Sequence, residues 1–371
     1  MLNKQLFIAL IASVLIWSSC TEDDDANPKL DIPQSYEFER NGASSVDYSG
    51  QIARLDMLAE LKAYIATAND SMALDAQILL DMFANENNPF DEAALNESGK
   101  RLEDKTFLTD VNYYKNVLNS AATASQAVTE ASEGTAGLIA RSATRVILVN
   151  EKGHEYTQIV EKGLMGATFL NQIYNAYLTD AKTGADIDNV TIVEGKNYTT
   201  LEHHFDEAFG YWGVNVDFDP QGENRFLGNY TLGREGFTEA ADALRAAFLT
   251  GRTAIVNSDF ETLDAQKDII YEQFEIAVAA TVIHYINESI TDLNNAEIGN
   301  LFHHASEGYG FALGLKYNPY KMITDTQYDD LVNSGFGTDG NFWDMSVESL
   351  NNAKNILISA YPSLTDIADD L

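Results

Sequence analysis

Apolar side chains recur every three or four residues along most of the chain, which is the spacing of amphipathic helices. The clearest case runs from Ser49 to Ala68, with Ser49 placed to cap the helix. Further helices are expected at about residues 73–84, 108–131, 155–178, 200–213, 236–255, 262–290, 296–314, 324–333 and 347–359. Residues 145–149 form a β-branched run that predicts a local ribbon at most. The pattern therefore predicts an all-α protein with little or no strand.

Two glycines interrupt the strongly apolar helix predicted over residues 155–178. Gly163 and Gly166 each cost roughly 1 kcal/mol relative to alanine inside a helix. We therefore expect either a kink at this point or another helix that approaches closely enough to offset the cost.

One stretch of the sequence occurs twice. Residues 201–211 and 301–311 both read L-x-H-H-x-x-E-[A/G]-[F/Y]-G-[Y/F], and they contain four of the six histidines. Self-similarity at a fixed offset indicates a duplicated structural unit, here a pseudo-symmetric pair. We predict two pseudo-repeated helical bundles, with residues 47–215 as the first half, 216–233 as a connecting loop and 234–371 as the second half.

The repeated stretch combines ligand types that hold metal ions. On a helix, the glutamate lies one turn after both histidines of its copy, and the second copy repeats this geometry. An imidazole beside a carboxylate is half of a metal site, which helix bundles complete from facing helices, so the two copies could share one site.

The predicted ligands are His203, His204, Glu207, His303, His304 and Glu307. Further ligands could come from Glu161, Glu272, Glu275, His284 or Glu288. Nitrogen and oxygen ligands suit iron, zinc or manganese. The alternative is that these pairs are hydrogen-bonded polar residues at the margin of the core.

Other chemistries lack their motifs. The sequence contains no H-E-x-x-H, and the reversed H-x-x-E-H fails because Ala208 and Gly308 stand where the second histidine would be. There is also no G-x-S-x-G and no phosphate-binding glycine loop. The net charge of −34 argues against nucleic acid as a partner, because phosphate backbones are bound by lysine and arginine.

The N-terminus has the features of a bacterial lipoprotein. Residues 1–20 have signal-peptide proportions, with an apolar run that is too short to cross a bilayer. Cys20 is the only cysteine and follows Ile-Trp-Ser-Ser, which resembles a relaxed lipobox, so we expect Cys20 to be lipidated. Residues 21–46 form an acidic, proline-containing tether. Its first residues resemble a surface-export signal, which predicts a surface-exposed outer-membrane lipoprotein held by the lipid anchor only.

Several segments resemble a lipoprotein family of the Bacteroidota. They are residues 36–46 (YEFERNGASSV), 51–58 (QIARLDML), 150–153 (NEKG), 161–167 (EKGLMGA) and 202–211 (EHHFDEAFGY). This family is catalogued as domain of unknown function 4856, and the resemblance covers nearly the whole mature chain. It is similar in turn to the imelysin-like proteins, two-bundle helical proteins that are found with iron-uptake genes and carry a G-x-H-x-x-E motif.

The imelysin-type motif maps onto this chain only in part. Its H-x-x-E portion corresponds to His204 with Glu207 and to His304 with Glu307, whereas Glu202 and Phe302 replace the glycine. The resemblance implies a role in iron or haem acquisition. The leading hypothesis is thus a non-enzymatic, lipid-anchored protein that binds iron or another divalent metal and presents it to an outer-membrane uptake receptor, with haem a weaker possibility. The alternatives are a surface adaptor with structural histidines and a metal-dependent hydrolase.

Overall fold

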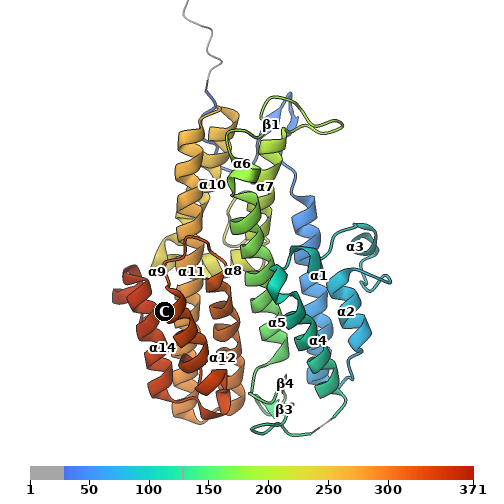
Figure 1. Cartoon of the computed structure of the whole chain (residues 1–371), viewed down its shortest axis with the longest axis vertical. Coiled ribbons are helices and arrows are strands. Elements are labelled where there is room, and N and C mark those ends of the chain that lie inside the picture. The colour runs from blue at the N-terminus through green and yellow to red at the C-terminus, as the bar shows by residue number, and fades with distance from the viewer. Residues whose placement is uncertain (1–28, 128) are drawn as a thin grey trace, which may run out of the picture.

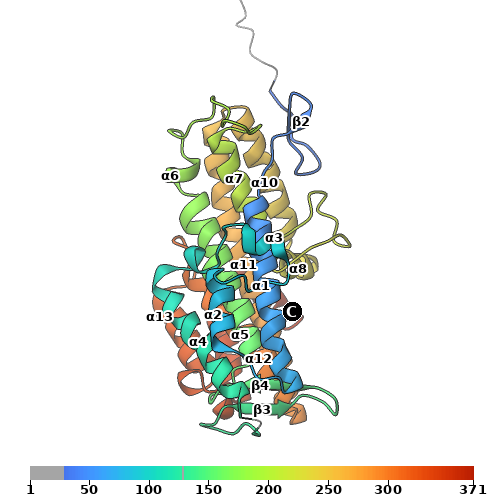
Figure 2. The ribbon, with the colours of Figure 1, turned by 90° about the vertical axis from the view of Figure 1, so that its right-hand side faces the viewer.

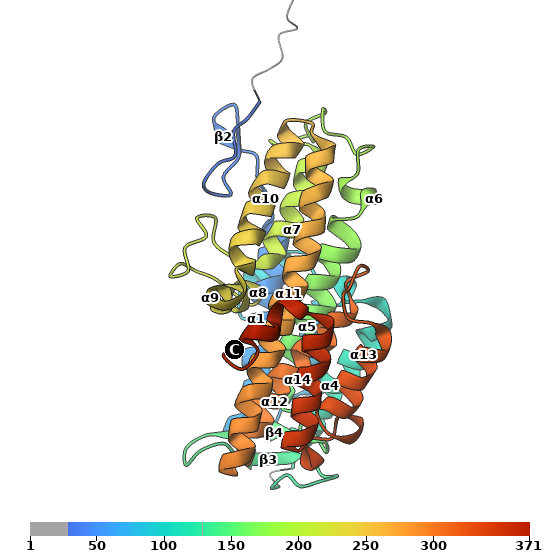
Figure 3. The same cartoon turned by 90° about the vertical axis from the view of Figure 1, so that its left-hand side faces the viewer.

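Helix α11 (Phe260–Asn295) spans 36 residues and runs along most of the length of the molecule (Figures 1 and 3). In the computed structural model, which describes residues 29–127 and 129–371, α10 (Ala240–Val256) packs along the first half of α11 and α12 (Ile298–Ala312) packs along the second half. By length and composition, α11 is the one helix in the described ranges that could cross a membrane. Because 72% of its most apolar 18-residue stretch is buried inside the protein, α11 has the character of a core helix.

The first part of the chain forms α1 (Ser49–Ala66), α2 (Ala76–Ala84), α3 (Ala93–Glu97), α4 (Val111–Ser125), α5 (Tyr156–Leu164), α6 (Asp180–Thr183) and α7 (Thr200–Trp212). The later part adds α8 (Leu227–Gly233), α9 (Glu235–Thr238), α13 (Asp325–Asp330) and α14 (Val347–Ala360). Helices α8, α9 and α14 also contact α11, whereas α1 to α5 lie together on one side of the molecule (Figure 2). The strands form two antiparallel ribbons, β1 (Glu39–Arg40) with β2 (Ala43–Ser44), and β3 (Gly137–Ala140) with β4 (Val146–Val149).

This architecture confirms the all-α prediction, and residues 146–149 form a local ribbon with β3, whereas the β1–β2 ribbon was not predicted. The buried apolar side chains form one cluster that includes residues of both predicted halves. Helix α8 occupies the last part of the predicted connecting loop at 216–233. The two-bundle pseudo-repeat and its boundaries stay predictions. The signal peptide at 1–20, with Cys20, lies outside the described residues.

The caps of two helices show where local sequence rules succeed and fail. Thr199 precedes the helix expected at 200–213 and caps α7 through a capping box with Glu202. The expected cap at Ser49 was wrong: Ser49 is the first residue of α1, and its backbone N–H and hydroxyl group both donate to Oδ1 of Asp47. A carboxylate two residues upstream thus takes the role assigned to the serine.

The two glycines in the predicted helix at 155–178 lie where other segments approach closely. After α5 the chain continues as π-helical turns, Met165–Leu170 and Ile173–Tyr177. A Cβ atom on Gly166 would lie 2.7 Å from Cα of Gly314, and one on Gly163 would lie 2.5 Å from the Tyr114 hydroxyl oxygen. The expectation of a close approach is confirmed, and the contact partner at Gly166 is the 3₁₀ turn Leu313–Lys316 that follows α12.

We predict that Gly166→Ala destabilises the protein by about 1–3 kcal/mol, because the added methyl group meets the backbone of Gly314, which cannot move aside as a side chain would. Urea denaturation of both proteins measures the difference. Gly236→Ala in α9 is the matched control, since a Cβ atom there has no neighbour within 4 Å and the change should be neutral or slightly stabilising. Equal losses in the two variants would contradict the close-contact explanation.

The loop that precedes α5 is held to the C-terminal part of the chain by a buried histidine. The Nε2–H group of His154 donates to the carbonyl oxygen of Gly340 at 2.6 Å, and the ring packs 4.3 Å from that of Phe342. Burial lowers the pKa of His154 from 6.5 to about 4, so the folded state disfavours the protonated ring.

Because the pKa of His154 is lower in the folded state, its contribution to stability is present above pH 6.5 and is lost as the pH falls towards 4. Between pH 7 and pH 4, the free energy of unfolding of the wild type should therefore fall by about 3 kcal/mol more than that of His154→Gln. Urea denaturation at several pH values tests this. Parallel pH curves for the two proteins would show that His154 titrates normally.

Candidate metal centre

The second copy of the repeated stretch lies on α12, which packs between the second half of α11 and α5. Leu301, Phe302 and Ala305 are buried and fix the apolar face of the helix in the core. His303 and His304 therefore project from the margin of that face, where both are partly buried. Ser306 adds a polar contact, because its hydroxyl group accepts the backbone N–H of Glu155 at 2.8 Å and so aligns the start of α5 with α12.

Each histidine of this copy is held by a carboxylate from another element. Nδ1 of His303 lies 2.6 Å from Oε2 of Glu155, which immediately precedes α5. Nδ1 of His304 lies 2.7 Å from Oδ2 of Asp292, near the end of α11. A carboxylate accepts the Nδ1 proton, so each neutral ring keeps its lone pair on Nε2. This arrangement, in which a carboxylate orients an imidazole whose other nitrogen is free, is typical of metal-binding histidines.

The third member of the cluster is Glu307, one turn further along α12. Its Oε2 lies 3.4 Å from Nε2 of His303. One ligand atom from each of His303, His304 and Glu307 lies within 4.8 Å of the other two. A tetrahedral ion with ligand distances of about 2.1 Å would separate its ligands by roughly 3.4 Å, so small side-chain rotations close the set.

A buried lysine balances the charge of the glutamate. Lys162 on α5 is 2% exposed, and its Nζ lies 3.3 Å from Oε1 of Glu307 and 2.5 Å from Oε2 of Glu161. Burial alone would lower the pKa of Lys162, but the two carboxylates outweigh it and raise the pKa, so the ammonium group stays charged. Lys62 binds the other oxygen of Glu161 at 2.7 Å. Lys162 therefore contacts Oε1 of Glu307, while Oε2 is the oxygen nearest His303.

The first copy of the stretch has a different environment around its histidines. Nδ1 of His203 donates to the backbone oxygen of Asp47 at 2.9 Å, and Nδ1 of His204 donates to that of Lys182 at 2.8 Å. The ammonium group of Lys182 also lies 3.2 Å from Nε2 of His204 and covers the atom that a metal would need. Burial lowers the pKa of His204, and the charge of Lys182 lowers it further.

Glu207 of the first copy accepts hydrogen bonds from neutral side chains. Its Oε1 accepts hydrogen bonds from the Gln51 amide and the Tyr177 hydroxyl, both at 3.1 Å. Its Oε2 lies 3.9 Å from Nε2 of His203. Within the described parts of the chain, His203, His204 and Glu207 form no group of three close ligand atoms, whereas the second copy does.

The two copies do not meet in space. Helix α7 carries the first copy in the upper half of the molecule, and α12 carries the second copy in the lower half (Figures 1 and 2). The idea that both copies complete one site is therefore not supported. If both copies bind a ligand, each copy binds it at a separate site.

The additional ligands considered from sequence have other contacts. Glu161 is paired with two lysines, and Glu275 accepts hydrogen bonds from Asn318, Tyr361 and the backbone of Met322. Glu272, His284 and Glu288 are outside the group of close ligand atoms. The residues that sequence reasoning missed are Glu155, Asp292 and Lys162. Glu155 precedes His303 by 148 residues, and no spacing pattern connects the two.

The candidate site lies within a family domain. The family model described as a domain of unknown function (DUF4856) matches residues 33–362. The chain belongs to the DUF4856 family. No curated protein and no solved structure shows significant similarity to it. The DUF4856 match contains all of α5, α11 and α12, so the carboxylates, the lysine and the three candidate ligands all lie within the family domain.

Proposed function

We propose that the protein binds a divalent transition-metal ion, iron or zinc, through Nε2 of His303, Nε2 of His304 and a carboxylate oxygen of Glu307. The observation that carries the proposal is the pair of hydrogen bonds from the two Nδ1 atoms to Glu155 and Asp292. They leave both Nε2 lone pairs available beside a carboxylate. Two imidazoles and one carboxylate are a ligand set that suits zinc and non-haem iron.

Three protein ligands leave at least one coordination position open. A closed site with four protein ligands would favour a structural ion, whereas an open position can take water or a ligand from a partner. This supports reversible binding and transfer of the ion. The groups around the site include Glu155, Asp292 and Lys162, and this polar lining suits a bare ion better than haem, which needs an apolar slot.

The candidate site lies far from the start of the described chain. The described chain begins at Lys29 at the upper end of the body, while α12 lies in the lower half (Figure 1). With Cys20 lipidated in the outer membrane, as we further propose, the metal centre would face away from the lipid surface. The protein would then be a surface lipoprotein that presents iron or another divalent metal to an uptake receptor.

The central test is a titration of the chain lacking residues 1–20 with Zn²⁺, and with Fe²⁺ under anaerobic conditions. We expect one ion per chain, and we expect His303→Gln or Glu307→Gln to weaken binding by more than about 100-fold, because loss of a ligand should exceed the 10- to 100-fold loss typical of second-shell partners. Calorimetry and elemental analysis measure the affinity and stoichiometry.

The first copy supplies matched controls for this titration. His203→Gln and Glu207→Gln change the same residue types at the same helical positions, and they should leave the affinity unchanged. A wild type that binds no ion would refute the proposal. Equal losses of metal affinity in the variants of both copies would also refute the proposal, because His303 and Glu307 would then have no special role.

Lys162 should oppose metal binding, because its ammonium group lies 3.3 Å from Glu307 and repels a dication in a poorly solvated site. We predict that Lys162→Gln raises the affinity for Zn²⁺ by at least about tenfold. Lys62→Gln is the control, since Lys62 pairs with Glu161 from the other side. The same titration measures all three proteins, and an unchanged or lower affinity in Lys162→Gln would show that the lysine does not compete with the ion.

A further inference from the structure

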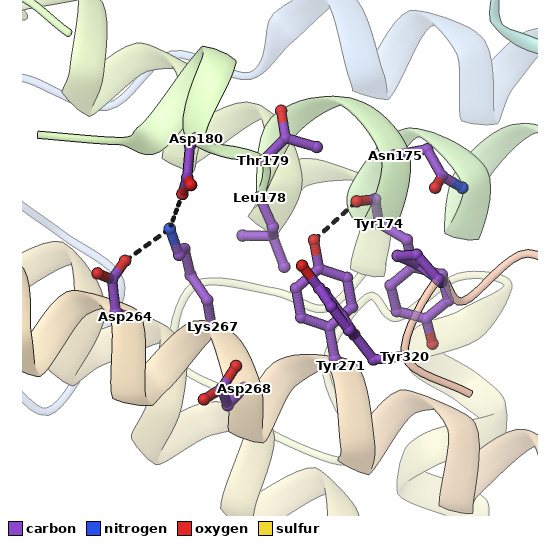
Figure 4. A pocket seen from close by; sticks show the side chains of 11 residues that line it. Tyr174, Asn175, Leu178, Thr179, Asp180, Asp264, Lys267, Asp268, Tyr271 and Tyr320 are labelled. Atoms are coloured by element: carbon purple, nitrogen blue, oxygen red, sulfur yellow. Dashed lines mark hydrogen bonds and ion pairs between the residues drawn. The ribbon is translucent and has the colours of Figure 1, made fainter. Parts of the chain in front are cut away.

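A cleft of about 460 Å³ lies beside the first half of α11, away from the proposed metal centre on α12 (Figure 4). Three segments that are distant in sequence line it: the first half of α11, residues 174–180, and the loop that contains Tyr320. Its volume is in the range of small-molecule sites, which is about 300–1,000 Å³. The cleft thus has the size and the walls of a ligand site.

One wall of the cleft is aromatic. The ring of Tyr320 is 72% exposed and meets the ring of Tyr271 edge to face, with centroids 5.0 Å apart (Figure 4). Tyr271 stacks in turn on Tyr174 at 5.4 Å. The Tyr174 hydroxyl group is buried and has no hydrogen-bond partner among the described residues. An aromatic ring left open beside a cleft offers its face to a ligand, whereas the buried Tyr174 hydroxyl does not reach the cleft.

The part of the cleft nearer the start of α11 is acidic. Nζ of Lys267 lies 3.2 Å from Oδ1 of Asp180 and 2.7 Å from Oδ1 of Asp264, so its charge is already neutralised (Figure 4). Asp268 also lines the cleft and forms no ion pair within the described ranges. The three aspartates and one lysine give the cleft a net charge of −2 (1 minus 3).

We propose that this cleft binds an organic cation, an ammonium or guanidinium group of a small molecule. The face of Tyr320 attracts a cation through its quadrupole, and Asp268 with the exposed Asp180 and Asp264 supplies the opposite charge. The net negative charge opposes an anion. The carboxylates here form no group of close metal ligands in the described chain, which argues against a bare metal ion. The site is independent of the metal centre.

The test is a calorimetric titration of the full chain in detergent with choline and with spermidine, at constant ionic strength. The neutral isostere of choline, 3,3-dimethyl-1-butanol, is the control ligand. We expect saturable binding of at least one cation and none of the neutral compound. Tyr320→Leu should weaken binding about three- to fivefold, the effect of one exposed cation–π contact. Asp268→Asn should also weaken binding, whereas Lys267→Gln should strengthen it by freeing two carboxylates.

Two variants away from the cleft serve as controls for the substitutions in it. Tyr113→Leu removes another exposed tyrosine and Asp325→Asn another exposed aspartate, and neither should alter the affinity. The proposal is overturned if neither cation binds saturably, if the neutral isostere binds as well as choline, or if Tyr320→Leu and Asp268→Asn bind as tightly as the wild type. Because Lys267→Gln is expected to increase the affinity, a general loss of structure in the variants cannot mimic the predicted result.

Discussion

The hydrogen bonds from Glu155 and Asp292 to the Nδ1 atoms of His303 and His304 connect the fold to its proposed chemistry. They tie the start of α5 and the end of α11 to α12, so three elements must pack correctly before either ring has its final orientation. They also decide which ring nitrogen carries the proton. The same histidines on an isolated helix would have neither a fixed orientation nor a fixed tautomer.

Charge balance explains why two copies of one sequence pattern have different surroundings. In the first copy, the helix is held by buried ion pairs beside the histidines: Arg252 binds Glu202 and Asp206 at 3.0 and 2.9 Å, and Arg40 binds Glu202 as well. These carboxylates already have cationic partners, and the histidines contact backbone oxygens instead. In the second copy, the carboxylates contact the histidines directly. The two copies therefore share a motif but differ in the hydrogen-bonded partners of their histidines, and our proposal that only the second copy binds metal rests on that difference.

The sequence predicted most of the helices because their apolar spacing is strong and their caps are local, as at Thr199. It also indicated a close approach at Gly166, because a glycine inside a helix needs a compensating contact. It predicted His303, His304 and Glu307 among six candidate ligands but could not choose them over the first copy. That choice depends on Glu155, which lies 148 residues before His303, and such long-range contacts leave no periodic signal in a single sequence.

The central claim is that the ion lies between the two Nε2 atoms and Glu307. A crystal structure of the zinc-loaded protein, with anomalous scattering measured at the zinc edge, tests it most directly. We predict one strong anomalous peak on α12, about 2.0–2.2 Å from Nε2 of His303, Nε2 of His304 and an oxygen of Glu307. A peak at His203 and Glu207, or peaks scattered over surface carboxylates with none on α12, would contradict the account.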